Sequence, residues 1–427
     1  MAVYIDKELC KSCKLCKNNC PKDVFEITHK VNKKGYNYME AVRPEKIVKG
    51  LCAAGFPAYY VGGCVRDRLL GRPVHDWDVT TAALPEEVMA LFEHCVPTGI
   101  RHGTVTVFLD GAQAEVTTFR TEGVYLDGRH PSEVRFVRTL AEDLSRRDFT
   151  INAMAMDADG NVTDLFGGRD DLARRCIRCV GDPEKRFRED ALRMLRAYRF
   201  SAQLGFALDA ATAGAVERCA PLAAALSMER IRDEMEKTLL SPCPQVLRTM
   251  ADAGLLKAAG IDALPELDWL AELPTEPSVR WAGLKVLFPE LEPSQLRLPS
   301  RLCSLIGRAA SAYCPQPDRL VLKRTVAENG TEAAEIAAAL AGEEALLSEI
   351  LASGECVTLG QLAISGGDLS WLRGREVGQM LHALLAHVLR HPEENTREAL
   401  LKLAQSPAFS ADALSNAGFS SKRGISG

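Results

Sequence analysis

Two aspartates, Asp76 and Asp78, stand two residues apart in the segment His75–Thr80. If this segment forms a strand, both carboxylates point to the same face of the sheet. Neighbouring carboxylates repel each other unless a cation lies between them, and Mg2+ prefers hard oxygen ligands and bridges phosphate groups. The pair therefore predicts a magnesium site for nucleotide phosphates, although a turn with two solvated aspartates is the simpler interpretation of this spacing alone.

A strand, a glycine pair and a helix are expected just before the aspartates. The apolar segment Ala58–Val61 predicts a short buried strand that ends at Gly62–Gly63, followed by a helix over 64–70. Two glycines let the backbone approach a phosphate closely, and a helix N-terminus presents free N–H groups. In this helix Arg66 could donate a charged fork to a triphosphate oxygen, and Asp67 could either orient Arg66 or cap the helix.

A third carboxylate is expected on a later strand. Residues 104–109 and 114–119 alternate as strands do, and turn residues separate them at 110–111. The second of these strands carries Glu115, which could reach the aspartate pair from a neighbouring strand. This order of elements resembles the DNA polymerase β-like nucleotidyltransferases.

Six sequence blocks make the resemblance closer, and it extends from about residue 45 to residue 405. In chain order they are Val61–Asp67, His75–Asp78, His102–Thr104, Glu115–Arg120, Arg146–Ala153 and Glu189–Arg193. Together they resemble the class II tRNA nucleotidyltransferases, the CCA-adding enzymes. The resemblance implies an α+β fold with a nucleotidyltransferase head, a small mixed sheet, and an all-α neck, body and tail.

The resemblance also implies domain boundaries and substrates. The catalytic head would cover 45–180, the nucleotide-recognising neck 181–245, and the tRNA-binding body and tail 246–408. Residues 409–427 are rich in small and polar side chains, so we expect them to be disordered. The substrates would be ATP, CTP and tRNA, with Mg2+ as cofactor.

The family's site roles carry over to matching positions. Asp76 and Asp78 would hold two Mg2+ ions, one activating the tRNA 3′-hydroxyl and the other binding the triphosphate and the leaving pyrophosphate. Glu115 would assist the attack as a third carboxylate or a general base. The residues expected at the nucleotide are Gly63, Arg66, Arg147, Asp148, Asn152, Asp190, Arg193, Arg196 and Arg199. Asn152 could equally be a helix-capping residue, and Arg196 and Arg199 could form a solvated basic stripe.

One charged segment suggests how the base is selected. Residues 184–200 predict a single helix with Pro183 in its first turn, and Asp190 and Arg193 then share a face. An arginine donates hydrogen bonds and a carboxylate accepts them. Cytosine and adenine both present a ring acceptor beside an amine, whereas guanine and uracil present a carbonyl there. The pair would thus accept C and A, and the alternative is an ordinary surface ion pair.

Two enzyme alternatives share this chemistry. Bacterial poly(A) polymerases share the head but typically carry a basic block before the strands with the third carboxylate, where this chain has Thr98–Thr104 in the CCA-enzyme style.

A-only enzymes are the second alternative. In the family, a loop corresponding to 121–131 is needed to switch from C to A addition, and CC-only relatives lack it. Its presence favours complete CCA addition. A non-catalytic tRNA-binding protein is disfavoured by the intact carboxylate set.

The first forty residues differ from the remainder. Their cysteines follow the C-x2-C-x2-C-x3-C-P pattern of [4Fe–4S] ferredoxins, at Cys10, Cys13, Cys16 and Cys20. Residues 1–42 thus resemble half of a two-cluster ferredoxin, but the second cysteine run is missing. We therefore favour a truncated half-domain over a cluster-binding, electron-transfer segment.

Charge composition changes at the same boundary. Residues 1–40 contain eight lysines, no arginine and five acidic residues, whereas the remainder contains nine lysines and all 35 arginines. The first part therefore carries a net charge of +3 and the second −8. We interpret this switch as a chimera joined near residues 41–46.

Composition bounds the remaining possibilities. A chain of 427 residues corresponds to two to four domains. It has no apolar run of about 18 residues and no apolar signal region, so we expect a cytoplasmic protein that does not span a membrane. A net charge of −5 means that any RNA site must be a local patch, for which 372–375 and 390–391 are weak candidates.

The remaining patterns are mostly helical. Helical periodicity is expected over 209–219, 228–240, 244–253 and 332–351, with breaks at 241–244 and 274–277. The other ten cysteines are expected to be mostly buried and apolar. Cys176 and Cys179 form a lone C-x2-C, for which a metal role is disfavoured.

Overall fold

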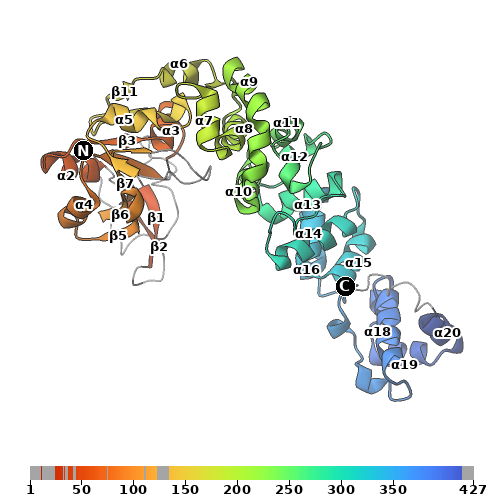
Figure 1. Ribbon diagram of the computed structural model, residues 1–427. Coiled ribbons are helices and arrows are strands. Elements are labelled where there is room, and N and C mark those ends of the chain that lie inside the picture. The colour runs from red at the N-terminus through yellow and green to blue at the C-terminus, as the bar shows by residue number, and fades with distance from the viewer. Residues whose placement is uncertain are drawn as a thin grey trace. The chain divides into compact units, whose positions relative to one another are not determined.

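The computed structural model describes Lys11, Lys33 and residues 25–31, 37–41, 45–74, 76–109, 112–122 and 134–415 (Figure 1). The chain divides into two compact units, one of residues 1–234 with 249–262 and the other of residues 235–248 with 263–427. Cys10, Cys13, Cys16 and Cys20 lie outside the described residues, as do the turn at 110–111 and most of the loop at 121–131.

A seven-stranded mixed sheet forms the centre of the first unit. Its strand order is β11-β10-β3-β4-β7-β6-β5. In chain order the strands are β3 (Ala58–Val61), β4 (Trp77–Thr81), β5 (Cys95–Gly99), β6 (Thr104–Leu109), β7 (Ala112–Thr118), β10 (Met154–Met156) and β11 (Val162–Asp164). Neighbours in the described sheet are antiparallel except β4 and β7, which are parallel. The predicted mixed sheet, and the predicted strands at 58–61 and 104–109, are confirmed.

Short helices and three small strand pairs complete this part of the chain. The helices are α2 (Glu45–Ala53), α3 (Gly63–Leu69), α4 (Pro85–Leu91), α5 (Leu140–Ser145) and α6 (Gly168–Ala173), with short 3-10 turns η1 (Ile100–His102) and η2 (Thr150–Asn152). The pairs are β1 (Phe25–Val31) with β2 (Asn37–Ala41), β8 (Arg120–Glu122) with β9 (Val134–Phe136), and β12 (Cys176–Ile177) with β13 (Ala207–Leu208). Helix α2 shows why such segments fold: Ile47, Val48 and Leu51 lie on one face and are completely buried.

The charged segment 184–200 is not one helix, so that prediction is wrong. Helix α7 (Pro183–Glu189) ends at Asp190, whose φ of −146° and ψ of 108° are extended, and α8 (Leu192–Leu204) begins two residues later. The break lets the Asp190 carboxylate accept from the backbone N–H of Leu192 at 3.0 Å, which satisfies a free donor at the start of α8. Hydrophobic periodicity does not predict this break, because the side chain of Asp190 bonds to a nearby backbone N–H instead of allowing the helix to continue.

The next helices agree with the predicted ranges. They are α9 (Ala210–Cys219), α10 (Met228–Leu239) and α11 (Val246–Asp252), with η3 (Ala220–Ala225) and η4 (Lys257–Ala259) between or after them. The break predicted at 241–244 separates α10 from α11.

The second unit is built from helices. They are α12 (Trp269–Glu272), α13 (Pro277–Leu287), α14 (Ser300–Ala312), α15 (Arg319–Asn329), α16 (Thr331–Ala341), α17 (Glu344–Ala352), α18 (Arg375–Val388), α19 (Arg397–Ala404) and α20 (Pro407–Ser415), with η5 (Leu359–Gln361), η6 (Gly366–Asp368) and η7 (Pro392–Glu394). The helical stretch expected over 332–351 is interrupted because Gly342 adopts φ +73° and ends α16. None of the helices in the described ranges is long and apolar enough to cross a membrane.

The start of the supposedly disordered tail is ordered. Residues 407–415 form α20, so the expectation of disorder from residue 409 is wrong for this stretch, and 416–427 lie outside the described residues. Phe409 and Ala413 pack against the buried cluster that includes Leu384, Val388 and Leu400. The segment is therefore held by apolar packing of Phe409 and Ala413.

Candidate active site

The three predicted carboxylates meet at the parallel strand pair. In the register of β4 and β7, Asp78 lies directly beside Glu115, and Asp76 lies two residues before Asp78, just outside β4. Burial raises the pKa of Asp78 to about 6, Arg147 opposes this, and the charges of Glu115 and Asp76 add to the rise. The half-buried Asp78 is thus flanked by two further carboxylates that are exposed to solvent.

This donor set fits Mg2+. All three side chains offer hard oxygen ligands, and the raised pKa of Asp78 reflects burial together with like charges that a divalent cation would offset. Two of the carboxylates are exposed, which leaves room for water and substrate ligands.

Gly62 lies closer to these groups than Gly63, which the sequence analysis chose. Gly62 has φ +80°, and a Cβ there would lie 3.3 Å from Arg147 Nη1 and 3.5 Å from Asp78 Oδ2. A Cβ on Gly63 would instead be nearest to Arg66 Nη2, at 3.5 Å. Gly62 therefore combines a left-handed backbone conformation with a close approach to the site.

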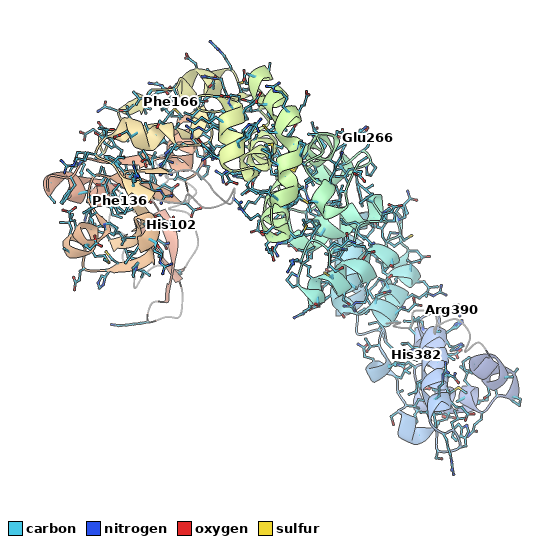
Figure 2. All side chains as sticks on the ribbon, viewed as in Figure 1. His102, Phe136, Phe166, Glu266, His382 and Arg390 are labelled. Atoms are coloured by element: carbon cyan, nitrogen blue, oxygen red, sulfur yellow. The ribbon has the colours of Figure 1, made fainter. Side chains whose placement is uncertain are left out.

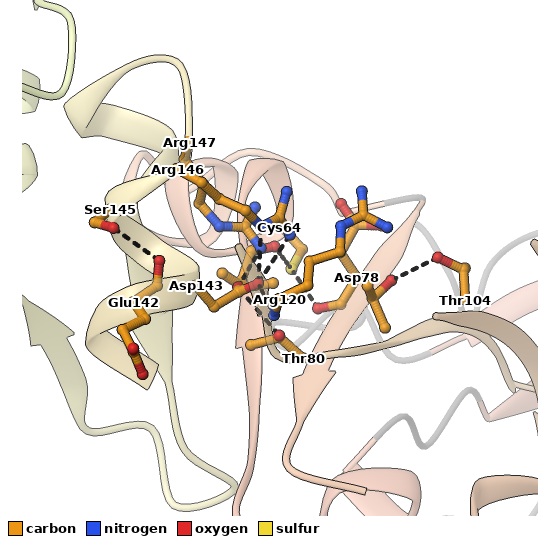
Figure 3. A network of polar contacts seen from close by, with 12 residues as sticks. Cys64, Asp78, Thr80, Thr104, Arg120, Glu142, Asp143, Ser145, Arg146 and Arg147 are labelled. Carbon is orange, nitrogen blue, oxygen red and sulfur yellow. Dashed lines mark hydrogen bonds and ion pairs between the residues drawn. The ribbon is translucent and has the colours of Figure 1, made fainter. Parts of the chain in front are cut away.

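Asp143, which the sequence analysis missed, anchors this region (Figure 3). Its fully buried carboxylate accepts from Thr80 Oγ1 at 3.1 Å and from the Arg120 backbone N–H at 3.3 Å. It also accepts from Arg146 Nε and Nη2 at 3.0 and 2.8 Å, and from Arg147 Nη2 at 3.3 Å. Burial alone would raise the pKa of Asp143, but Arg146 and Arg147 outweigh it and hold that pKa below its ordinary value. The sequence signal that could have indicated these ion pairs is the position of Arg146 and Arg147, three and four residues after Asp143.

Arg147 connects this anchor to Asp78. One end of its guanidinium binds Asp143, and Nη1 lies beside Gly62. Its Nε is buried and has no hydrogen-bond partner among the described residues. A cation held in this way offers an attractive charge for an anionic ligand that reaches Asp78.

Arg66 is oriented from two sides. Its Nε and Nη2 donate to the two carboxylate oxygens of Asp67 at 2.9 and 2.8 Å, and Nη1 donates to Asn152 Oδ1 at 2.8 Å. Of the two options for Asp67, orientation of Arg66 is therefore the one observed, because α3 has no side-chain cap. Asn152 is buried at the end of η2 and acts on Arg66 rather than as the helix cap.

Asp190 and Arg193, the pair predicted to select the base, are held by residues on either side of the helix break. Asp190 Oδ2 accepts from Arg230 Nη2 of α10 at 2.8 Å. Arg193 Nη1 donates to Glu189 Oε2 at 2.6 Å, and its backbone N–H donates to the Asp190 carbonyl at 3.0 Å. Asp190 and Arg193 do not share a face of one helix as predicted, because the helix breaks at Asp190. The backbone hydrogen bond between them nevertheless keeps the two residues within one turn of each other. Arg230 was not predicted from the sequence, because it lies 40 residues from Asp190 along the chain.

Arg196 and Arg199 are not a freely solvated stripe. Arg196 Nε and Nη2 both donate to Asp148 Oδ2, at 2.8 and 2.6 Å, and Asp148 also accepts from the Phe149 N–H at 2.8 Å. Burial opposes ionisation, but Arg196 lowers the pKa of Asp148 to about 2. Arg199 is buried, donates from Nη1 to Gln203 at 2.9 Å and lies 3.9 Å above the Phe200 ring.

Most of the described cysteines are buried or half-buried. Cys64 is buried, donates from Sγ to the Val61 carbonyl at 3.2 Å, and burial raises its pKa to about 11. Cys179 is buried and Cys176 half-buried, and the metal-binding geometry found in the described ranges does not include them. Among the ten described cysteines, only Cys52 is exposed, which agrees with a structural rather than a reactive role.

Two family models match parts of the chain. The Poly A polymerase head domain matches residues 58–178, and the Probable RNA and SrmB- binding site of polymerase A matches 205–269. The head is common to poly(A) polymerases and CCA-adding enzymes, so the longer relatives decide between them. The CCA-adding enzyme of Geobacillus stearothermophilus is 40% identical over 385 residues, which cover 83% of this chain and 94% of that enzyme. This chain belongs to the CCA-adding enzyme family.

Further CCA-adding enzymes agree. The enzyme of Limosilactobacillus fermentum is 39% identical over 391 residues, covering 86% of this chain and 96% of that enzyme. The crystal structure of the Bacillus stearothermophilus CCA-adding enzyme in complex with CTP matches with a TM-score of 0.71 and 38% identity, covering 84% of this chain and 96% of that one. The resemblance inferred from the six blocks is confirmed. None of these findings supports the ferredoxin-like interpretation of residues 1–42, which stays a prediction.

Proposed function

We propose that this CCA-adding enzyme completes the 3′ end of tRNA without a nucleic-acid template, using CTP and ATP and releasing pyrophosphate. The observation that carries the proposal is the near-full-length relation to CCA-adding enzymes at 40% identity. Within the proposal, residues 45–180 are the catalytic head, 181–245 the neck, and 246–408 the tRNA-binding body and tail. The enzyme is proposed to act in the cytoplasm, where tRNA is processed.

The carboxylates would organise the transfer. Asp76 and Asp78 would hold Mg2+, which when bound supplies Lewis-acid activation of the tRNA 3′-hydroxyl and charge neutralisation of the triphosphate and departing pyrophosphate. Glu115, beside Asp78 in the sheet, would accept the proton of the 3′-hydroxyl on a carboxylate oxygen or serve as a third ligand. Arg147, held by Asp143, would attract the triphosphate toward Asp78.

The neck would select the base. The Asp190 carboxylate can accept from the exocyclic amine of C or A, and the Arg193 guanidinium can donate to the adjacent ring nitrogen. Guanine and uracil carry a carbonyl in place of the amine, which would face the carboxylate as a second acceptor. Such a mismatch leaves buried polar groups unpaired, which discriminates more strongly than a lost contact. Asp148 and Asn152 would support the sugar side of the site.

The test offers CTP alone to tRNA that lacks CCA. We expect exactly two cytidines to be added, and a single adenosine after ATP is supplied. A poly(A) polymerase would add adenosines without cytidine, and an A-only enzyme would act only on tRNA that already ends in CC. Failure to incorporate C would contradict the proposal.

Deleting residues 121–131 is expected to leave CC addition and abolish the final A. In the family this loop is needed for the switch from C to A, so the shortened enzyme should stop at CC. Gel analysis of tRNA products with CTP and ATP together checks the outcome. If the shortened enzyme still adds the terminal A to tRNA, residues 121–131 are not needed for the switch from C to A addition.

Arg230→Ala is expected to raise the KM for both CTP and ATP by about 10–100-fold, because Asp190 would lose a charged hydrogen bond worth about 1.5–3 kcal/mol. Arg232→Ala is the matched control, since Arg232 pairs with the neighbouring, half-exposed Asp233. Steady-state kinetics with tRNA ending in C or CC measures both. An unchanged KM in Arg230→Ala would contradict a positioning role.

The N-terminal cysteines stay a separate prediction. A cluster at Cys10, Cys13, Cys16 and Cys20 would make anaerobically purified protein brown. Iron analysis of that protein distinguishes a cluster-binding segment from a truncated half-domain.

A further inference from the structure

A group of metal-ligating side chains lies in the second unit, on and just after the last turn of α18. His391, Glu393 and Glu394 each place a ligand atom within 4.8 Å of the other two. His387, one helical turn before His391, joins them through a contact of 2.8 Å between its Nε2 and Glu394 Oε2. Two imidazoles and two carboxylates therefore lie within eight residues of sequence, and none of the four belongs to the carboxylate or nucleotide site described above.

The distances suit a small tetrahedral ion. Donor atoms at bonds of about 2.0–2.1 Å in a tetrahedron lie roughly 3.3 Å apart. His387 and Glu394 are slightly closer than this, and His391 Nδ1 lies 3.7 Å from Glu393 Oε1. The two imidazole rings lie side by side, with centroids 4.7 Å apart and planes tilted by 33°. His391, Glu393 and Glu394 form the group within 4.8 Å, and His387, which reaches it through Glu394, would become the fourth ligand by rotation of its side chain.

The backbone that carries these groups is held in place. The His391 N–H donates to the His387 carbonyl at 3.0 Å, and the Glu394 N–H donates to the His391 carbonyl at 3.0 Å. Asn395 ties the end of the segment to residues 361–363: it accepts from the Ala363 N–H at 2.9 Å and donates to the Gln361 carbonyl at 3.0 Å. His387 also meets the Phe409 ring of α20 edge-on, at 6.0 Å. The ligands thus start from a fixed backbone, which lowers the entropy lost on binding.

The donor types select the ion. Imidazole nitrogen suits zinc and similar transition metals, whereas Mg2+ and Ca2+ prefer oxygen ligands alone. Two carboxylates balance the charge of one divalent ion. We propose that His387, His391, Glu393 and Glu394 form a structural zinc site that joins the end of α18 to the segment before α19.

Zinc titration of the metal-free full-length chain, in excess Mg2+, tests the site by calorimetry. The key variant is the double replacement His387→Gln with His391→Gln, and the matched control is His382→Gln on an exposed part of the same helix (Figure 2). His387 follows His382 by five positions, so the two lie on different helix faces. Cysteine sites are common to all three proteins and cancel in the comparison.

We expect the wild type and His382→Gln to bind one more zinc ion per chain than the double variant. Equal binding in all three proteins would overturn the proposal. A second variant, Glu393→Gln with Glu394→Gln, keeps both imidazoles and is expected to lose the same ion, so the result does not depend on how one variant folds. The readouts are bound zinc, the cobalt spectrum and the unfolding temperature, none of which requires nucleotide addition, so the test is separate from that of the proposed function.

Cobalt provides a spectroscopic check of the ligands. The difference spectrum between cobalt-loaded wild type and double variant is expected to show visible bands of a tetrahedral ion with nitrogen and oxygen ligands. A sulfur-to-metal charge-transfer band in that difference would place the ion on cysteines and overturn the assignment. Zinc is also expected to raise the thermal unfolding temperature of the wild type but not of the double variant, since binding to the folded chain stabilises it.

Discussion

Asp78→Asn is expected to reduce nucleotide addition by at least about 10²–10³-fold while making the metal-free chain more stable. Both effects come from the same carboxylate. It would be lost as a ligand for Mg2+ and thus as a means of stabilising transition-state charge. In the metal-free fold, however, this carboxylate is half-buried beside Glu115 and Asp76, so that its charge is unfavourable.

The pH dependence follows from the direction of the shift. The pKa of Asp78 is about 6 in the folded chain, against an ordinary value of 3.8. The folded chain therefore binds this proton more tightly than the unfolded chain does. Above pH 6 the ionised group costs stability, and the cost disappears as the pH falls from 6 toward 3.8. Removing the charge should raise the free energy of unfolding at pH 7 by roughly 1–3 kcal/mol.

Denaturant unfolding in the presence of a chelator measures this gain, and CTP incorporation measures the loss of activity. Asp76→Asn is the matched control: it removes a second proposed ligand, but its carboxylate is exposed, so activity should fall without a gain in stability. With excess Mg2+ the wild type should recover stability and Asp78→Asn should not. Unchanged stability of Asp78→Asn in chelator, or retained activity, would contradict the assignment.

Local patterns predicted much of the head. The strand at 58–61, the glycine turn, the helix beginning near residue 64 and the strands before and after residues 110–111 depend on short-range periodicity and turn chemistry, which can be read from adjacent residues. The adjacency of Asp78 and Glu115 could be expected only from the order of elements, because it depends on a parallel pairing between strands separated by more than 30 residues. The blocks that resemble a known family supplied that order.

The contacts that hold the site were harder to predict. The Asp190 carboxylate accepts hydrogen bonds from the Leu192 N–H and from Arg230, which favours a conformation outside the helix. Sequence periodicity cannot predict a partner that lies 40 residues away. Asp143 resembles any acidic residue in an amphipathic helix until the fold buries it against β4. A positioning residue next to its partner, such as Asp67 beside Arg66, could be predicted from the sequence, whereas Asp143 and Arg230 could not.

Asp143→Ala is expected to lower the free energy of unfolding by about 3–5 kcal/mol, the range for breaking a buried ion pair from one side. The alanine would leave Thr80 without its acceptor and two largely buried guanidiniums, those of Arg146 and Arg147, without this counter-charge. Asp143→Asn keeps the shape and an acceptor oxygen, so its loss should be smaller. Thermal and denaturant unfolding measure both.

The same change should weaken nucleotide binding beyond its effect on stability, because Arg147 would lose the anchor that holds it beside Gly62 and Asp78. Asp171→Ala provides the matched control: Asp171 is also buried in the head, but its carboxylate accepts from Thr150 Oγ1 at 2.5 Å and from Arg178 Nε at 2.9 Å rather than from Arg147. Measured well below both unfolding temperatures, KM for CTP should rise in Asp143→Ala and stay near the wild-type value in Asp171→Ala. Equal KM values in the two variants would mean that Asp143 serves the fold alone, and that Arg147 keeps its position without it.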